Sequence, residues 1–202
     1  RSAAGDRRGP GLGDDPRRVA IHSQPWEMPD APWTLHATFE AEPVPAPPRS
    51  LDVLALRARC PRPVPIPDAY ATLAAAGLAY GPAFARMEAL WQGDGEAIAE
   101  VRVPEGFETA GVAPVLLDAA LHAVVAVASL DAGPRVPFAI ASVVVHREVG
   151  RAVLVHVRRA DAESRDAVVL DVTLADPDDG AILVAIRGLE LRPALAPPRP
   201  DA

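Results

Sequence analysis

Two ionisable side chains that could transfer protons interrupt an otherwise apolar stretch, residues 114–130. Asp118 and His122 are four residues apart, a spacing that places both side chains on one face of a helix. Because the stretch is apolar on nearly every side, it predicts a buried helix. Buried polar groups are costly without partners. The carboxylate and the imidazole therefore either satisfy each other or are kept for proton transfer.

Composition limits the kinds of protein that this chain can be. Its 202 residues suit one domain or one and a half, and half of them are hydrophobic. A net charge of −7 argues against a nucleic-acid partner, which would need a basic surface. The single cysteine, Cys60, excludes an internal disulfide and a multi-cysteine metal site, and its neighbours do not suggest a nucleophile.

The sequence contains neither a predicted membrane span nor a signal peptide. Asp118 and His122 break the longest apolar run before it reaches the length of a transmembrane helix. The first residues contain arginine but no apolar core of the kind that a signal peptide needs. We therefore expect a cytoplasmic protein without a membrane partner.

The first quarter of the chain predicts little buried structure. Residues 1–18 are rich in Gly, Arg and Asp and predict a flexible lead-in. Residues 17–24 and 33–42 predict two strands joined by a proline-containing loop. His22 and His36 are expected on the surfaces of these strands.

Proline-rich segments at 44–48 and 61–67 predict a linker or a wrapped connection rather than a core element. Between them, residues 51–59 predict a short strand. Asp68 is then expected to cap a helix over residues 69–76, which ends at Gly77.

The rest of the chain predicts strands around the apolar helix. The expected strands are 87–91, 96–103, 139–149, 152–159, 167–175 and 181–192. A single apolar helix among antiparallel strands indicates the α+β class, with a curved sheet wrapped around that helix. Strands do not alternate with helices, so a parallel Rossmann-type sheet is not expected.

Three segments, in this order, resemble the dehydratase domains of modular polyketide synthases. That family has a double hot-dog fold, in which each repeat wraps an antiparallel sheet around a helix. The segments are Tyr80-Gly81-Pro82-Ala83-Phe84, Leu116-Leu117-Asp118-Ala119-Ala120-Leu121-His122 and Val136-Pro137-Phe138.

The resemblance implies an incomplete double hot dog. Residues 1–18 would form a lead-in, and 19–48 the remaining strands of the first repeat with a proline-rich linker. Residues 49–193 would form a complete second repeat, followed by a proline-rich tail over 194–202. The front of the first repeat is absent from the 202 residues, which leaves a sheet edge open to pairing.

The resemblance also implies a reaction. The family removes water from a 3-hydroxyacyl chain on the phosphopantetheine arm of an acyl carrier protein, without a further cofactor. In that family a histidine in the motif His-x-x-x-Gly-x-x-x-x-Pro removes the proton beside the thioester, and an aspartate helps the β-hydroxyl to leave as water. Asp118 matches the aspartate and His122 the last position of its motif, whereas Ala113 replaces the family's histidine before Pro114. On an apolar helix, Asp118 would be kept partly protonated, as an acid requires.

Six further residues would bind the acyl chain if the resemblance extends to the substrate tunnel. The alternative is that they are ordinary turn and core residues. They are Tyr80, Gly81, Pro82, Phe84, Pro137 and Phe138.

The catalytic histidine motif is missing from this sequence. His146 is followed by Gly150, but Val155 stands where the motif has proline. One interpretation is a degenerate dehydratase-like domain that serves dimerisation or spacing in a synthase. The alternative is an active dehydratase, or a related hot-dog lyase or cyclase, that uses Asp118 with a histidine from elsewhere. A third idea makes His122 the replacement base.

The expected partners follow from the resemblance. They are an acyl carrier protein, neighbouring synthase domains and a second copy of the chain, with no nucleic acid and no membrane. Four arginines on predicted strands or turns could contact an acidic carrier protein. A solvated strand face explains them more simply; they are Arg147, Arg151, Arg158 and Arg159.

Overall fold

The computed structural model describes residues 17–28, 30–43, 50–105, 113–128, 135–160 and 167–194. Most of the predicted lead-in, most of the proline-rich tail and all of the linker at 44–48 lie outside these residues. The chain divides into two compact units, residues 1–46 and 47–202.

The first unit is a β-hairpin. Strands β1 (Arg17–Ser23) and β2 (Thr34–Ala41) pair antiparallel, as predicted, with a bulge at Ile21/His22. His22 and His36 are exposed, also as predicted, and His36 Nε2 lies 2.6 Å from the Ser23 hydroxyl. Two strands form no core of their own, and the hairpin's large apolar side chains are accordingly exposed.

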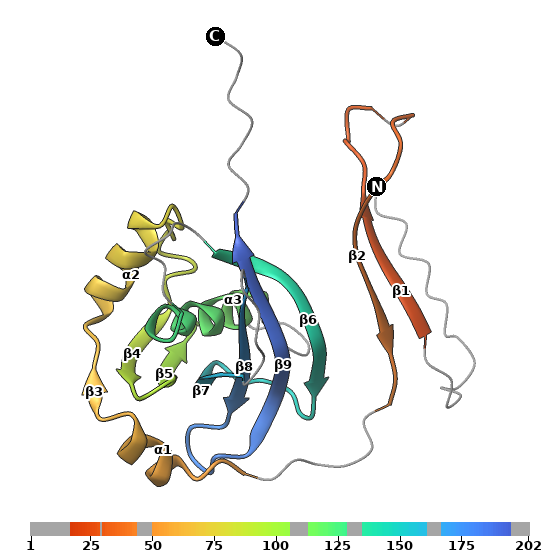
Figure 1. Ribbon diagram of the computed structural model, residues 1–202. Coiled ribbons are helices and arrows are strands. Elements are labelled where there is room, and N and C mark those ends of the chain that lie inside the picture. The colour runs from red at the N-terminus through yellow and green to blue at the C-terminus, as the bar shows by residue number, and fades with distance from the viewer. Residues whose placement is uncertain are drawn as a thin grey trace. The chain divides into compact units, whose positions relative to one another are not determined.

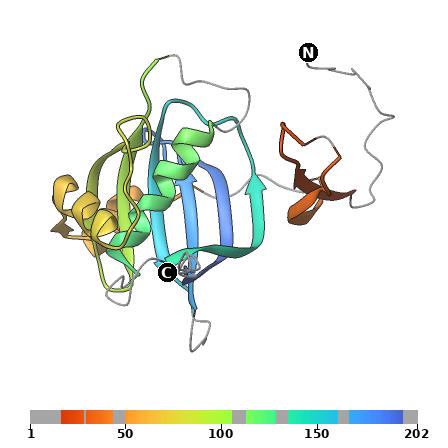
Figure 2. The same cartoon turned by 90° about the horizontal axis from the view of Figure 1, so that it is seen from above.

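The second unit is a seven-stranded antiparallel sheet that curves around one helix (Figures 1 and 2). Across the sheet the strands are β3 (Arg62–Pro63), β4 (Met87–Gln92), β5 (Glu96–Arg102), β7 (Ala152–Arg159), β8 (Val168–Ala175), β9 (Ile182–Pro193) and β6 (Arg135–Val145). Along β7, Val153, Val155 and Val157 enter the main core, because alternate residues of a strand share a face. The predicted α+β hot-dog fold is confirmed.

The central helix is shorter than predicted. Helix α3 (Pro114–Leu121) has proline in its first turn and continues as a 3₁₀ turn, η1 (His122–Ala126). Residues 129–130 lie outside the described part of the chain. The β-branched pair Val124–Val125 disfavours further α-helix. Alanines such as Ala119 and Ala123 are fully buried, and these small side chains let the helix approach the sheet closely.

The strand predicted for residues 51–59 is wrong, because this segment forms helix α1 (Val53–Arg59). The Asp52 carboxylate accepts the Ala55 N–H at 3.0 Å and so caps the helix. Leu56 and Cys60 pack on Ile98, on the face of the sheet away from α3. Alternating apolar residues in a short segment fit a strand and a two-turn helix equally well, which explains the error.

The helix predicted from residue 69 begins earlier. Helix α2 (Ile66–Ala75) has proline in its first turn, and its N-cap residue is Pro65. Asp68 lies within that first turn rather than at the cap, so the predicted capping role is wrong. The segment predicted as a linker at 61–67 thus contributes edge strand β3 and the start of α2.

Gly180 holds the segment before α1 against the β8–β9 turn. It has a φ of +72°, its carbonyl accepts the Leu51 N–H, and a Cβ there would lie 2.5 Å from the Leu51 carbonyl oxygen. The positive φ disfavours alanine, and its Cβ would clash with the Leu51 carbonyl oxygen. Gly180→Ala should therefore lower the free energy of unfolding by about 3 kcal/mol. Urea titration measures this change.

Gly95 provides the control for Gly180. Its φ is +66°, but no heavy atom lies within 4 Å of a Cβ built on it. Gly95→Ala should therefore lower the free energy of unfolding by only about 1 kcal/mol, from the positive φ alone. Equal losses in the two variants would contradict the role assigned to the close approach.

Candidate functional site

Asp118 and His122 lie side by side on α3 and η1, as their spacing predicts. His122 Nε2 is 3.2 Å from Asp118 Oδ2. The His122 side chain is only 2% exposed, whereas that of Asp118 is 42% exposed. The expectation that both groups are buried is therefore wrong for Asp118. The imidazole is therefore buried inside the unit, whereas the carboxylate lies at its surface.

Two tyrosines complete the surroundings of His122. Tyr70, on α2, places its hydroxyl 3.3 Å from His122 Nδ1, and the same hydroxyl accepts the Met87 N–H at 3.1 Å. Tyr80, in the loop after α2, lies against the imidazole with ring centroids 3.8 Å apart. Both ring nitrogens of His122 therefore have polar neighbours, and an aromatic ring covers one face of the imidazole.

Burial sets the protonation of this cluster. It lowers the pKa of His122, and the nearby Asp118 acts in the opposite direction. It raises the pKa of Tyr70 and of Tyr80, and for Tyr80 the Asp118 charge adds to the rise. Near neutral pH the imidazole is therefore uncharged and both phenols keep their protons.

The other predicted substrate-binding residues lie in two places. Gly81, Pro82 and Phe84 form an exposed turn in which the Phe84 N–H donates to the Gly81 carbonyl at 3.0 Å. Of this motif, Tyr80 is the residue that packs on His122. Pro137 and Phe138 lie exposed on strand β6, which pairs with β9.

The Phe138 ring makes a cation–π contact with an arginine. The Arg192 guanidinium lies 3.5 Å from the centre of that ring. Tyr80 therefore joins the Asp118–His122 cluster, whereas Phe138 contacts the end of β9.

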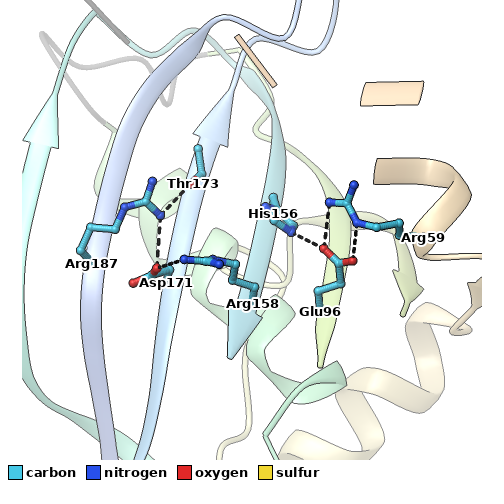
Figure 3. A network of polar contacts seen from close by, with 7 residues as sticks. All are labelled: Arg59, Glu96, His156, Arg158, Asp171, Thr173 and Arg187. Carbon is cyan, nitrogen blue, oxygen red and sulfur yellow. Dashed lines mark hydrogen bonds and ion pairs between the residues drawn. The ribbon is translucent and has the colours of Figure 1, made fainter. Parts of the chain in front are cut away.

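A second polar network lies on the opposite face of the sheet (Figure 3). Glu96, on β5, accepts two hydrogen bonds from Arg59 of α1, at 2.6 and 3.1 Å. Its Oε2 is also 2.8 Å from His156 Nε2 on β7. His156 alternates with the core-facing valines of β7, so it points away from α3. The network fastens α1 to the outer face of the sheet.

Asp171 continues this network along β8. It accepts hydrogen bonds from Arg158 at 2.9 Å and from the Gly188 N–H at 3.1 Å, and Arg187 lies 3.6 Å away (Figure 3). An open hollow of about 910 Å³ is lined by arginines from both halves of the network. The charges of Arg59, Arg158 and Arg187 each face a carboxylate, so we assign the network to structure.

The outer network should make the protein sensitive to acid. Burial lowers the pKa of His156 although Glu96 acts to raise it, and the hydrogen bond from Arg59 lowers the pKa of Glu96. Groups with a depressed pKa in the folded state bind fewer protons there than in the unfolded chain. Stability should therefore fall as pH drops below the ordinary pKa of histidine, and further as it passes that of glutamate.

Urea unfolding at a series of pH values tests this expectation. His156→Gln should flatten the loss of stability between about pH 7 and 5, because glutamine does not titrate. His22→Gln, at an exposed position of β1, is the control and should leave the slope unchanged. A slope that is the same in the His156 variant and in the unmodified chain would contradict the role of His156.

The described residues do not favour a metal site, a membrane span or a cysteine nucleophile. Among the described residues, no group of three or more His, Cys, Asp or Glu side chains could hold a metal ion. Within the same residues, no helix has the length and apolarity needed to cross a membrane. Cys60 is buried, which raises the pKa of its thiol and disfavours the nucleophilic thiolate.

Comparison with known proteins places the chain in one family. The family profile described as "Polyketide synthase dehydratase N-terminal domain" matches residues 48–201. The spectinabilin polyketide synthase system protein NorA' of Streptomyces orinoci is 37% identical over 191 residues. The polyketide synthase GfsB of Streptomyces halstedii is 32% identical over 203 residues.

These relatives are far longer than the chain. The two matches cover 89% and 92% of it but only 5% and 4% of the relatives. Among solved structures, the dehydratase domain from the CurJ module of curacin polyketide synthase has a TM-score of 0.77 at 20% identity. That match covers 91% of this chain and 65% of the solved one, and it shows a common fold. From the extent of the profile match and the identity to NorA', we conclude that the chain belongs to the polyketide synthase dehydratase family.

Proposed function

We propose that Asp118 is the acid of a dehydratase site that acts on 3-hydroxyacyl thioesters carried by an acyl carrier protein. The observation that carries the proposal is the contrast in exposure within one hydrogen-bonded pair. His122 is enclosed, whereas the Asp118 carboxyl that it orients is open to a ligand. A buried partner that fixes an accessible reactive group is the arrangement that proton transfer requires.

The proposed reaction is an elimination. A base removes the proton from the carbon beside the thioester, while Asp118 gives a proton to the β-hydroxyl. The carbon–oxygen bond breaks, a carbon–carbon double bond forms and water leaves. Asp118 is then a carboxylate, and the His122 N–H stabilises its Oδ2.

The geometry favours a supporting role for His122 over the role of base. Its Nε2 faces Asp118, its Nδ1 faces Tyr70 and its side chain is almost inaccessible. A group that removes a substrate proton must reach that proton directly or through one water. We therefore propose that the base comes from a segment other than the described second unit.

The substrate class implies the partners. The acyl chain would arrive on the phosphopantetheine arm of a carrier protein, and no other cofactor is needed. Neighbouring synthase domains and a second copy of the chain complete the proposed assembly, which we place in the cytoplasm.

A non-catalytic module is the second candidate. It is favoured by the positions of the other two histidines of the second unit. His156 is bound to Glu96 on the outer face of the sheet. His146 follows β6, where its backbone N–H donates to the Leu183 carbonyl and its ring Nδ1 is buried away from solvent. A domain without a base would keep its fold for dimerisation or spacing within a synthase.

Mass spectrometry separates the two candidates. A synthase polypeptide that contains this chain is incubated with a 3-hydroxyacyl carrier protein, and the acyl group is monitored for the loss of one water. Water loss supports the dehydratase. No loss from a folded polypeptide, together with a stable dimer in sedimentation, supports the spacer, whereas a strict monomer without turnover would count against both candidates.

A further inference from the structure

The Tyr70 hydroxyl lies between two hydrogen-bonding groups whose roles can be worked out from the positions of protons. On one side the Met87 backbone N–H lies 3.1 Å away, and this group can only donate. On the other side His122 Nδ1 lies 3.3 Å away and can either donate or accept. The phenol itself carries one proton and lone pairs that accept. The protonation of His122 therefore decides the direction of the bond.

Asp118 determines that protonation from the far side of the ring. Asp118 Oδ2 accepts hydrogen bonds whether the carboxyl is ionised or carries its proton on Oδ1, so His122 Nε2, at 3.2 Å from Oδ2, must carry a proton. A neutral imidazole has a single N–H, and with the proton on Nε2 its Nδ1 is an acceptor. The Tyr70 oxygen already accepts the Met87 N–H, so its own proton is available to Nδ1. Both ends of the chain of contacts thus select the same tautomer.

We propose that Tyr70 is a positioning residue that donates its hydroxyl proton to His122 Nδ1 and fixes His122 as the neutral Nε2–H tautomer facing Asp118. The relay runs from the Met87 N–H through the Tyr70 hydroxyl and the His122 ring to Asp118 Oδ2. It spans α2, the start of β4 and the α3–η1 junction. This proposal rests on the dehydratase function proposed above for Asp118.

A neutral His122 matters because Asp118 has to carry a proton in order to act as an acid. An imidazolium at this distance would favour the ionised carboxylate and oppose that step. A neutral N–H on Oδ2 orients the carboxyl with less bias toward ionisation, so that Oδ1 can hold the proton for the β-hydroxyl. Tyr80 covers the imidazole ring and adds apolar surroundings, but it forms no hydrogen bond with His122 in the described structure.

The difference between the two tyrosines supplies a matched pair of variants. Tyr70→Phe removes the donor to Nδ1, and Tyr80→Phe keeps the ring that lies on His122. The test is nitrogen NMR of the histidine rings as a function of pH, in the unmodified chain and in both variants. The unmodified chain should show a His122 ring protonated on Nε2 alone near neutral pH.

Each variant has a separate expected result. In Tyr70→Phe, Nδ1 becomes free to take a proton, and protonation of His122 should begin up to about one pH unit higher. The acidic limb of the dehydration rate against pH should move by the same amount. Tyr80→Phe should leave the tautomer and the midpoint pH of the acidic limb unchanged, whatever its effect on the rate itself. A proton on Nδ1 in the unmodified chain would overturn the relay, as would a Tyr70→Phe profile equal to that of Tyr80→Phe.

The relay and the proposed function can fail independently. The Nε2–H tautomer in a protein that removes no water would overturn the dehydratase and leave a structural relay. Water loss from a protein with a proton on Nδ1 would retain the dehydratase and overturn the role of Tyr70. The tautomer of the unmodified chain decides the relay even if Tyr70→Phe does not fold.

Discussion

Asp118→Asn is expected to lower the rate of dehydration about a thousandfold, the typical loss when a positioned acid is removed. The amide has the shape of the carboxyl but cannot pass a proton to the β-hydroxyl. Its oxygen can still accept the His122 N–H, and the side chain is partly exposed, so the fold should be retained. The mass-spectrometric assay measures the rate in a synthase polypeptide that contains the chain.

Two further variants show whether the loss belongs to Asp118 itself. Asp68→Asn changes an exposed carboxylate in the first turn of α2 and should leave the rate unchanged. His122→Gln keeps a donor that can reach Asp118, so we expect a loss of only about tenfold. If a folded His122 variant lost as much as Asp118→Asn, His122 would be the base after all. An unchanged rate in Asp118→Asn would refute the proposed function.

The parts of the structure that follow from local pattern could be predicted from the sequence. Strand β7 has the predicted bounds, and the Asp118–His122 contact follows from helical spacing. Residues 51–59 are wrongly predicted as a strand, because the packing of Leu56 and Cys60 on Ile98 depends on the folded sheet. Alternating apolar residues alone do not separate a short helix from a strand.

The contacts that could not be predicted from the sequence join residues that are far apart along the chain. Tyr70 is 52 residues from His122, and only the packing of α2 against η1 brings them together. Glu96 and His156 are diagonal neighbours, because Glu96 lies opposite Arg158 and Ile98 opposite His156. Such pairs depend on the register of β5 against β7, and a shift of one residue would turn every side chain to the other face.

Leu116→Ala should lower the free energy of unfolding by about 3 kcal/mol, because it removes a fully buried side chain from α3. Leu116 belongs to the main core, where the helix meets the sheet. Ala119 and Ala120, the other buried residues of α3, are too small to fill the cavity. Because the same helix carries Asp118, a loss of this packing should also loosen the candidate site. Urea unfolding measures the stability.

Leu54→Ala is the matched control for this change. Leu54 lies on α1 and is 82% exposed, so its truncation should change the free energy of unfolding by less than about 0.5 kcal/mol. The same leucine-to-alanine change in two helices thus isolates burial from helix propensity. Similar losses in both variants would mean that α3 is not held by its apolar contact with the sheet. In that case the rigid placement of Asp118 and His122, on which the proposed acid depends, would need another physical cause.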